Sequence, residues 1–224
     1  MGRPYVVSAI PGLLSADVVL LQENWRPHGG CSVAEQVAAA GGYDVVAEMD
    51  VSSETTLHEL RVSNASVPER GAWGLAVLSR IPLVRREDIW LGTASRDVSA
   101  RGAQVVELGQ PGAAVLRLVN VHLTNRLSHG PGQLLRLRHA LSSDEVPTVV
   151  AGDFNMCRPT IYLARGYRPA VRGRTWPARR PVAQLDHILV SRDITIAGGR
   201  TLGGIGSDHL PVRVELAHVA DSTA

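Results

Sequence analysis

The stretch Val-Val-Ala-Gly-Asp-Phe-Asn, residues 149–155, is the part of the sequence that decides how the fold is interpreted. Its apolar half is a short run typical of a strand buried in a core. Its polar half places Asp153 and Asn155 directly after that strand. In layered α/β folds, reactive groups gather where core strands emerge into loops. An Asx turn would account for either polar residue alone, but not for the apolar run before them.

Four other segments combine an apolar run with an acid or an imidazole. Their polar residues are Glu23 in 18–23, His122 in 118–122, Asp186 in 184–188, and Asp208 with His209 in 206–211. A single polar residue at a strand end is usually a satisfied turn or surface residue. Five such ends in one small domain predict instead a site where strand ends meet.

The residue types in this set favour metal-assisted phosphoester chemistry. Hard oxygen ligands without thiolates suit Mg²⁺ or Mn²⁺. Hydrolysis of a phosphoester needs a polarised phosphoryl oxygen, an oriented water molecule and a neutralised leaving oxygen. A divalent metal with positioned acids, amides and imidazoles supplies all three. The sequence therefore predicts a hydrolase that activates water.

Six motifs, in this order, resemble the endonuclease/exonuclease/phosphatase superfamily. They are Leu-Gln-Glu (21–23), Gly-Leu-Ala-Val-Leu-Ser-Arg (74–80), Asn-Val-His-Leu (120–123), Gly-Asp-Phe-Asn (152–155), Leu-Asp-His-Ile (185–188) and Ser-Asp-His-Leu-Pro-Val (207–212). The fourth and sixth motifs are fairly specific together. The resemblance implies an α/β fold, a four-layered sandwich of two packed, mostly antiparallel sheets flanked by helices. It places the site at one open edge of the sandwich.

The resemblance also implies roles for individual residues. Glu23 resembles the principal metal ligand, and Asp208 a further ligand, direct or through water, for Mg²⁺ or Mn²⁺. Asp153 and Asn155 match the pair that orients the attacking water and holds phosphate oxygens. Gly152 would allow the tight passage of the backbone between strand and loop.

Two histidines complete the implied site. Asp186 and His209 resemble a carboxylate–imidazole couple, in which the acid fixes the ring tautomer and raises its basicity. His122 resembles a second active-site histidine that donates to the scissile phosphate or assists the leaving group; the alternative is a satisfied core histidine. In the secreted deoxyribonuclease branch a carboxylate supports this ring. The roughly matching position here is Trp73, so that branch fits poorly.

The amino-terminal end departs from the family pattern. Family members usually open with a strand that ends in a metal-binding asparagine, followed by a helix. Here 22 residues precede Glu23, no asparagine occurs before Asn24, and residues 5–14 have helical spacing. We therefore expect the usual first strand to be lacking, by truncation rather than natural loss.

The remaining patterns predict one domain over residues 1–224, with a core of about 5–217. Helices are expected over 32–40, where Ser32 and Glu35 form a capping box, and over about 133–141. Further strands are expected over 73–79, 105–108, 115–121, 149–154, 188–190 and 212–216. No repeat or low-complexity linker marks a second domain.

Composition sets the broad class. The chain has 224 residues, 45% hydrophobic and 20% charged, with a net charge of +2, which fits one globular domain. No apolar stretch approaches the roughly 20 residues of a membrane span, and no secretory signal is visible, so we expect a cytoplasmic protein. Cys31 and Cys157 are expected to be buried or partly exposed free thiols rather than a disulfide. Nothing indicates an obligate protein partner, and we expect a monomer.

Arginine clusters give the only hint of a substrate class. The densest cluster lies in 172–180, just before Asp186, where Trp176 could stack on a base or sugar and Arg174 could grip phosphate. The alternative interpretation of this segment, an exposed, mobile loop in which Trp176 simply caps the core, explains the sequence equally well. The first hypothesis is a phosphodiesterase acting on nucleic acid. The alternatives are a phosphodiesterase or phosphatase for phospholipid head groups or inositol phosphates, and a catalytically weak binding module.

Overall fold

A computed structural model describes residues 14–60, 70–110, 115–141 and 146–217. The elements are β1 (Val18–Pro27), α2 (Val33–Gly41), β2 (Val45–Thr56), β3 (Arg70–Ser79), β4 (Leu83–Gly92), β5 (Arg101–Gly109), β6 (Val115–His122), α3 (Gly130–Ala140), β7 (Thr148–Asp153), α4 (Arg158–Ile161), β8 (Tyr167–Pro169), β9 (Asp186–Ser191), β10 (Ile196–Thr201) and β11 (Val212–Leu216). The helix expected over 5–14 lies, except for Leu14, outside the described residues, as does the question of a preceding strand.

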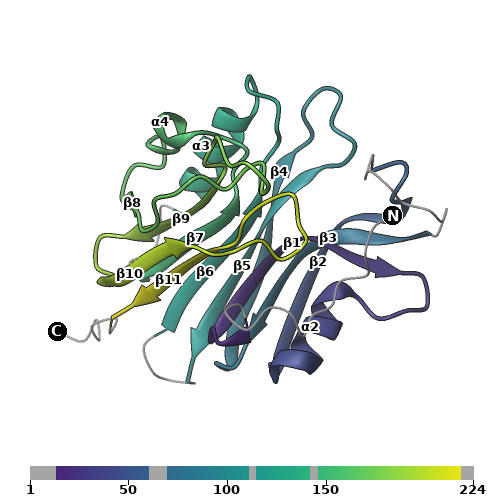
Figure 1. The fold of residues 1–224 in the computed structure, drawn as a ribbon, viewed down its shortest axis with the longest axis horizontal. Helices are drawn as coiled ribbons and strands as arrows, with labels where there is room; N and C mark the ends of the chain where they lie inside the picture. The colour runs from purple at the N-terminus through teal and green to yellow at the C-terminus, as the bar shows by residue number, and fades with distance from the viewer. Residues whose placement is uncertain (1–13, 61–69, 111–114, 142–145, 218–224) are drawn as a thin grey trace.

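Two packed sheets form the middle of the molecule, as predicted. One has six strands in the order β4-β5-β6-β7-β9-β8, and the other has three in the order β1-β3-β2. All neighbouring strands are antiparallel except β6 and β7, which run parallel. The hairpin β10-β11 is a separate two-stranded piece beside them (Figure 1). Because β6 and β7 are parallel, their carboxyl ends meet at one edge of the sheet.

Aliphatic side chains fill the space between the two layers of strands. Val77 of the three-stranded sheet and Val106, Leu118 and Val149 of the six-stranded sheet belong to one buried cluster. Partly buried residues of β1 and β11, such as Val18 and Val214, pack against it. The short apolar runs in the sequence are therefore buried on both faces, as strands in a sandwich core must be.

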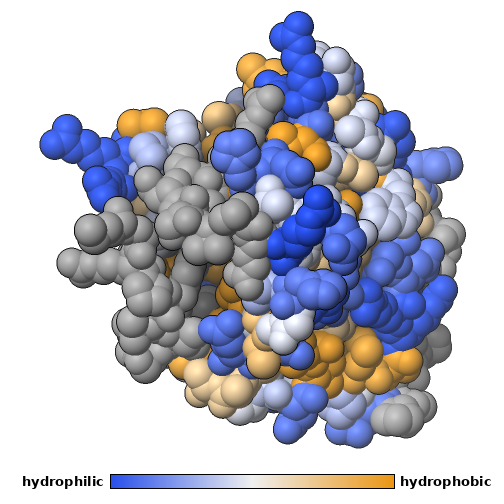
Figure 2. Space-filling model, turned by 90° about the vertical axis from the view of Figure 1, so that its right-hand side faces the viewer, coloured by the Kyte–Doolittle hydropathy of each residue, from blue (hydrophilic) through white to orange (hydrophobic). Residues whose placement is uncertain are grey.

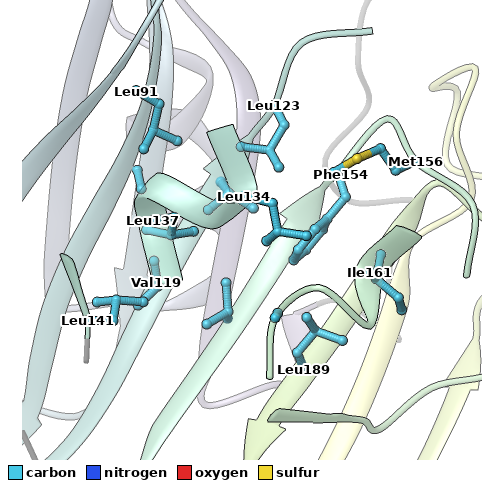
Figure 3. Packing of buried hydrophobic residues seen from close by; sticks show 14 of the residues in the cluster. Leu91, Val119, Leu123, Leu134, Leu137, Leu141, Phe154, Met156, Ile161 and Leu189 are labelled. Carbon is cyan, nitrogen blue, oxygen red and sulfur yellow. The ribbon is translucent and has the colours of Figure 1, made fainter. Parts of the chain in front are cut away.

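Helices cover the outer faces and complete four layers. Figure 3 shows Leu134 and Leu137 of α3 in contact with the outer-face cluster of the six-stranded sheet, which includes Val119 and Leu189. On the opposite side, α2 packs through Val37 and its neighbours on the three-stranded sheet. The expected four-layered α/β sandwich is thus confirmed.

The local signals for α2 are also confirmed. Ser32 Oγ accepts the backbone N–H of Glu35, and the Glu35 carboxylate accepts the backbone N–H of Ser32. The helix ends before Gly42, which has a left-handed φ of 65°. α3 begins at Gly130, three residues earlier than predicted, because Pro131 in its first turn needs no hydrogen-bond partner there.

Sequence patterns missed the short strands β8 and β10, and two long strands, β2 and β4. Both carry many charged or polar residues, and β4 is mostly exposed from Leu83 to Glu87. They form because neighbouring strands supply hydrogen-bond partners, which is a tertiary effect on propensity. β2 is an edge strand, where charges discourage pairing with other chains. Figure 2, which views the side of the molecule nearest α2 and β2, shows a mainly hydrophilic surface with an apolar area at its lower edge.

Two smaller expectations can be checked directly. Cys31 and Cys157 are free thiols, as expected, but both are exposed rather than buried. None of the helices among the described residues is long and apolar enough to cross a membrane.

Candidate active site

The carboxyl end of β7 is the centre of the site. Asp153, the last residue of β7, lies opposite His122 of β6 and opposite Asp186 of β9 in the hydrogen-bonded register. Three strands therefore deliver an imidazole and two carboxylates to one edge of the six-stranded sheet. All three residues are 8% exposed. Burial and strand pairing hold these groups rigidly.

Gly152 makes this approach of strands possible. Its φ is 141°, and a Cβ at this position would lie 2.0 Å from the carbonyl oxygen of Val121. Any side chain would thus force β7 away from β6. The glycine that the sequence placed between strand and loop is required by the contact between these two backbones.

The segment 207–211 brings His209 onto Asp186. His209 Nδ1 lies 2.8 Å from Asp186 Oδ2. The donor atoms of Asp153, Asp186 and His209 all lie within 4.8 Å of one another, a geometry that could hold a metal ion. The segment is itself anchored, because the backbone N–H of Leu210 donates to the Thr175 carbonyl oxygen over 2.8 Å. The sequence-predicted carboxylate and imidazole are therefore neighbours.

Asn155 closes a turn over Asp153. Its backbone N–H donates to Asp153 Oδ1 over 2.7 Å, so an Asx turn is present. Its side-chain Nδ2 donates to the Leu123 carbonyl oxygen over 2.9 Å, and its φ is 51°. Asn155 Oδ1 accepts no hydrogen bond from the described residues, and Asp153 Oδ2 faces the His122 ring instead of the turn. One oxygen of each side chain thus remains available to a ligand.

Glu23 comes from the opposite sheet, through a distortion of β1. The β1-β3 register shifts between Gln22 and Asn24, so Glu23 is the extra residue of a β-bulge, with a φ of 58°. Such bulges redirect a side chain and are common beside active sites. On the partner strand, a Cβ at Gly74 would lie 1.9 Å from the Met49 carbonyl oxygen, so the neighbouring strands approach closely here.

Glu23 and Asp208 lie outside the 4.8 Å cluster, yet they act on it electrostatically. Glu23 is exposed, yet the protein atoms around its carboxyl displace part of the surrounding water. This desolvation raises the pKa of the carboxyl, and the charge of Asp208 raises it further. Asp208 also helps to raise the pKa of His209. The structure thus brings the two predicted metal ligands close to each other and to His209, on the more open side of the site.

Asp153 is the acid of the site whose pKa is raised to about 7. Burial raises the pKa of Asp153 to about 7, with a further contribution from the charge of Asp186. Burial alone would lower the pKa of His209, but its hydrogen bond to Asp186 and the nearby acids outweigh burial and raise the pKa to about 9. Several acids therefore repel one another here, an arrangement that a bound cation would relieve.

His122 has a different environment. Burial, followed by the charge of Arg101, lowers its pKa well below the usual value, so the ring is neutral. Its Nε2 lies 3.6 Å from Asp153 Oδ2, and its Nδ1 is buried without a hydrogen-bond partner. The Trp73 ring lies against it, with 5.6 Å between ring centroids. As expected from the sequence, the indole of Trp73 lies beside His122 where the deoxyribonuclease branch has a supporting carboxylate. His187 Nε2, by contrast, donates to the Met156 carbonyl oxygen over 2.9 Å, inside the core.

Trp176 and Arg174 lie on a loop attached to the site. Trp176 is 40% exposed, and Arg174 is exposed. The backbone N–H of Ala178 donates to the Asp208 carbonyl oxygen over 2.7 Å, which fastens this loop to the segment that carries His209. The two residues are therefore near the site without belonging to its buried part.

Sequence reasoning missed two residues that build the site. Thr175 is fully buried, and its Oγ1 accepts the backbone N–H groups of Leu185 and Asp186 over 3.0 and 3.2 Å. Arg101 is 7% exposed and interacts electrostatically with Asp153 and Glu23. No local pattern distinguishes a threonine or arginine of this kind, because its role depends on which strands surround it.

Comparisons with known proteins agree with this geometry. A model of the Endonuclease/Exonuclease/phosphatase family matches residues 3–209. No curated protein matches the chain by sequence.

Solved structures show the same fold at low sequence identity. An endonuclease/exonuclease/phosphatase from Beutenbergia cavernae DSM 12333 aligns with a TM-score of 0.72 at 20% identity, over 94% of this chain and 64% of that one. This chain thus covers less than two thirds of that protein. A mannosyl-6-phosphatase of Bacteroides thetaiotaomicron VPI-5482 aligns with a TM-score of 0.71 at 14% identity, over 95% and 89% of the two chains. The human Nocturnin catalytic domain with bound sulfate aligns with a TM-score of 0.63 at 20% identity, over 90% and 80%. Since the family model spans nearly the whole chain, the protein belongs to the endonuclease/exonuclease/phosphatase family.

Proposed function

We propose that this protein is a divalent-metal-dependent phosphoester hydrolase that uses an activated water molecule. The observation that carries the proposal is the convergence of Asp153, Asp186 and His209, whose donor atoms lie within 4.8 Å of one another. These residues come from distant parts of the chain and meet at one sheet edge. A purely structural role would not require three buried or half-buried ionisable groups to share one position.

The acids of the site fit Mg²⁺ or Mn²⁺. Asp153, Asp186, Glu23 and Asp208 offer carboxylate oxygens, the ligands that hard divalent cations prefer, and no thiolate is among the proposed site residues. Glu23 and Asp208 repel each other, and Asp153 has a raised pKa, so the site holds more negative charge than it can stabilise alone. Glu23 and Asp208 would hold the cation on the open side. When bound, it would polarise a phosphoryl oxygen and lower the pKa of a bound water molecule.

Asp153 and Asn155 would position the attacking water. Asp153 Oδ1 is occupied by the turn, so Oδ2 is the oxygen that can accept a proton from water. Its pKa of about 7 suits a general base near neutral pH. The unpaired Oδ1 of Asn155 would accept the second hydrogen of the same water. Neither side chain can rotate freely, because the turn and the bond to Leu123 fix both.

The two histidines would act on the phosphoryl group. Nδ1 of the protonated His209 ring donates to the Asp186 carboxylate. Its Nε2 is then free to donate to a phosphoryl oxygen. His122 is neutral, so it would contribute a hydrogen bond rather than a positive charge to the leaving group. The Asp186–His209 pair resembles the orienting arrangement by which an acid fixes an imidazole tautomer.

Nucleic acid is the substrate class that we favour. Trp176 offers an exposed ring beside the site, and Arg174 with its neighbours offers positive charge for a phosphate backbone. Phospholipid head groups or inositol phosphates remain the second candidate, since arginines bind both. The cytoplasmic location and the monomeric state expected from the sequence also stay predictions.

A substrate panel tests the proposal. The purified protein is assayed with Mg²⁺, with Mn²⁺ and with a chelator, on single-stranded DNA and RNA, an inositol phosphate, a phospholipid and a sugar phosphate. We expect metal-dependent hydrolysis that the chelator abolishes and that is fastest on an oligonucleotide. Absence of metal-dependent turnover on the whole panel would refute the proposal and favour a binding module. Oligonucleotide binding that weakens with salt, without vesicle binding, would support nucleic acid over lipid.

A further inference from the structure

Arg101 is a buried cation that lacks enough partners in the protein. It opens β5 and is 7% exposed. Its Nε and Nη1 atoms are enclosed and make no hydrogen bond. Burial is accordingly the main influence on the guanidinium, and it lowers the pKa. Leaving buried charged donors unpaired is costly, so an arginine in this state calls for an explanation.

The nearest acid, Asp97, does not satisfy Arg101. Arg101 Nε lies 3.8 Å from Asp97 Oδ2, beyond hydrogen-bond distance. The other oxygen of Asp97 already accepts a hydrogen bond from Thr124 Oγ1 over 2.8 Å and lies 3.7 Å from Arg126 Nε. Asp97 thus places a negative charge behind Arg101 and holds it in position, while leaving its donors free.

The far side of the guanidinium is closed by an indole. Arg101 Cζ lies 5.7 Å from the centroid of the Trp73 ring, the same ring that contacts His122. The crevice that these three residues line has no space for a water molecule. Water within this crevice therefore cannot satisfy the enclosed Nε and Nη1 atoms. Nη2 is not among the enclosed atoms, so it is the guanidinium nitrogen that a ligand can reach.

That side is where phosphate would lie. Asp153 and Glu23 act on Arg101 electrostatically, and Arg101 acts on His122. Because His122 is neutral and lies against Trp73 rather than a carboxylate, it adds no positive charge to this side of the site. The positive charges that act on His122 are those of Arg101 and of the protonated His209. We propose that Arg101 donates a hydrogen bond from Nη2 directly to a non-bridging oxygen of the substrate phosphoryl group.

This inference rests on the proposed function, because it assumes a phosphoryl ligand. Its physical basis is that a guanidinium presents several donors in a fixed plane, which suits phosphate geometry. An arginine placed before substrate arrives, in a dry crevice, loses little freedom on binding. The guanidinium charge, which no hydrogen bond within the described residues offsets, is then the feature that makes the site ready for an anion.

The test compares variants that separate anion binding from folding. Arg101→Met keeps the apolar stem and removes the charge, and the double variant Asp97→Asn/Arg101→Met also removes the buried acid that would lose its neighbour. Arg85→Met is the matched control, because Arg85 pairs with exposed Glu87 near the opposite end of the β4-β5 ladder. The probe is inorganic phosphate with Mg²⁺. Its binding is followed by ³¹P NMR and by competitive inhibition of hydrolysis, and melting temperatures report folding.

The expected result is a loss of phosphate affinity of about tenfold to a hundredfold in the double variant, the effect of one charge-assisted hydrogen bond. kcat/KM should fall at least as much, and Arg101→Lys should restore part of both. Arg85→Met should match the wild type. A folded double variant that binds phosphate like the wild type would overturn the inference and leave Arg101 as a counter-charge for Asp97. Because phosphate binding needs no turnover, this outcome is distinct from failure of the proposed hydrolase activity.

Discussion

The two sheets contribute to the site in different ways. The six-stranded sheet delivers His122, Asp153 and Asp186 on paired strands, with side chains that are nearly buried. The three-stranded sheet delivers Glu23 on a bulge, exposed to solvent, and Asp208 comes from a loop. Groups that must keep an exact orientation are thus held by strand register, whereas groups expected to contact an exchangeable cation lie on irregular, open backbone. The rigid side and the open side should therefore respond differently to mutation.

The largest expected effect is on the rigid side. Asp153→Asn should lower turnover by about 10²–10⁴-fold, because the amide cannot accept a proton from water. The fold should persist, since the amide oxygen can still accept the N–H of Asn155. Circular dichroism and a melting curve check the fold, and steady-state kinetics check turnover. Wild-type rates in this variant would exclude Asp153 as the base.

The next effect tests how closely β6 and β7 must approach. Gly152→Ala should destabilise the protein by at least about 3 kcal/mol, because its Cβ would meet the Val121 carbonyl oxygen at 2.0 Å. Gly132→Ala in α3 is the matched control. A Cβ at Gly132 would meet nothing within 4 Å, and helix propensity should make that variant slightly more stable. Urea unfolding measures both, and equal stabilities would contradict the close approach.

A third prediction concerns pH in the metal-free protein. The folded-state pKa of Asp153, about 7, exceeds its ordinary value near 4, so folded protein binds more protons between these values and stability should fall as pH rises from about 4 to about 7. The loss is at most about 4 kcal/mol. His209, with its pKa raised to about 9, adds stability below its ordinary pKa that is lost as pH rises through about 9.

The comparison variant for this pH effect is again Asp153→Asn. It should remove the decline between pH 4 and 7, and in chelator above pH 7 it should be more stable than the wild type. Urea denaturation at several pH values measures this. A wild-type protein whose stability rises over that range would show that burial and the charge of Asp186 do not raise the pKa of Asp153 as the structure indicates.

The smallest effect is expected on the open side. Glu23→Gln should raise the Mg²⁺ concentration needed for half-maximal activity by at least roughly tenfold, while activity at saturating Mg²⁺ changes much less. Glu87→Gln, on the exposed part of β4, serves as control. Metal titrations of activity provide the measurement. A Glu23 variant that lost activity without any change in metal requirement would place Glu23 in the rigid, reacting part of the site.

The sequence alone predicted much of the molecule, and the reason is locality. The apolar run 149–151 and the capping box at Ser32 leave patterns between near neighbours in the chain, which can be recognised. The need for Gly152, in contrast, comes from its contact with Val121 on another strand. β2 and β4 escaped prediction because partner strands rather than their own residues make them strands. The site residues could be named from strand ends and motif order, but their distances could not.

Only the tertiary structure decided how these groups act. That Asp153 uses one oxygen for a turn, that His122 is neutral beside Trp73, and that Arg101 is buried with free donors all follow from the packing of strands far apart in sequence. The chemistry of an ionisable group is set by its desolvation and by charges a few ångströms away. The amino-acid order determined which groups reach the sheet edge; the packing of two sheets determined their pKa values, their free donors and their neighbours.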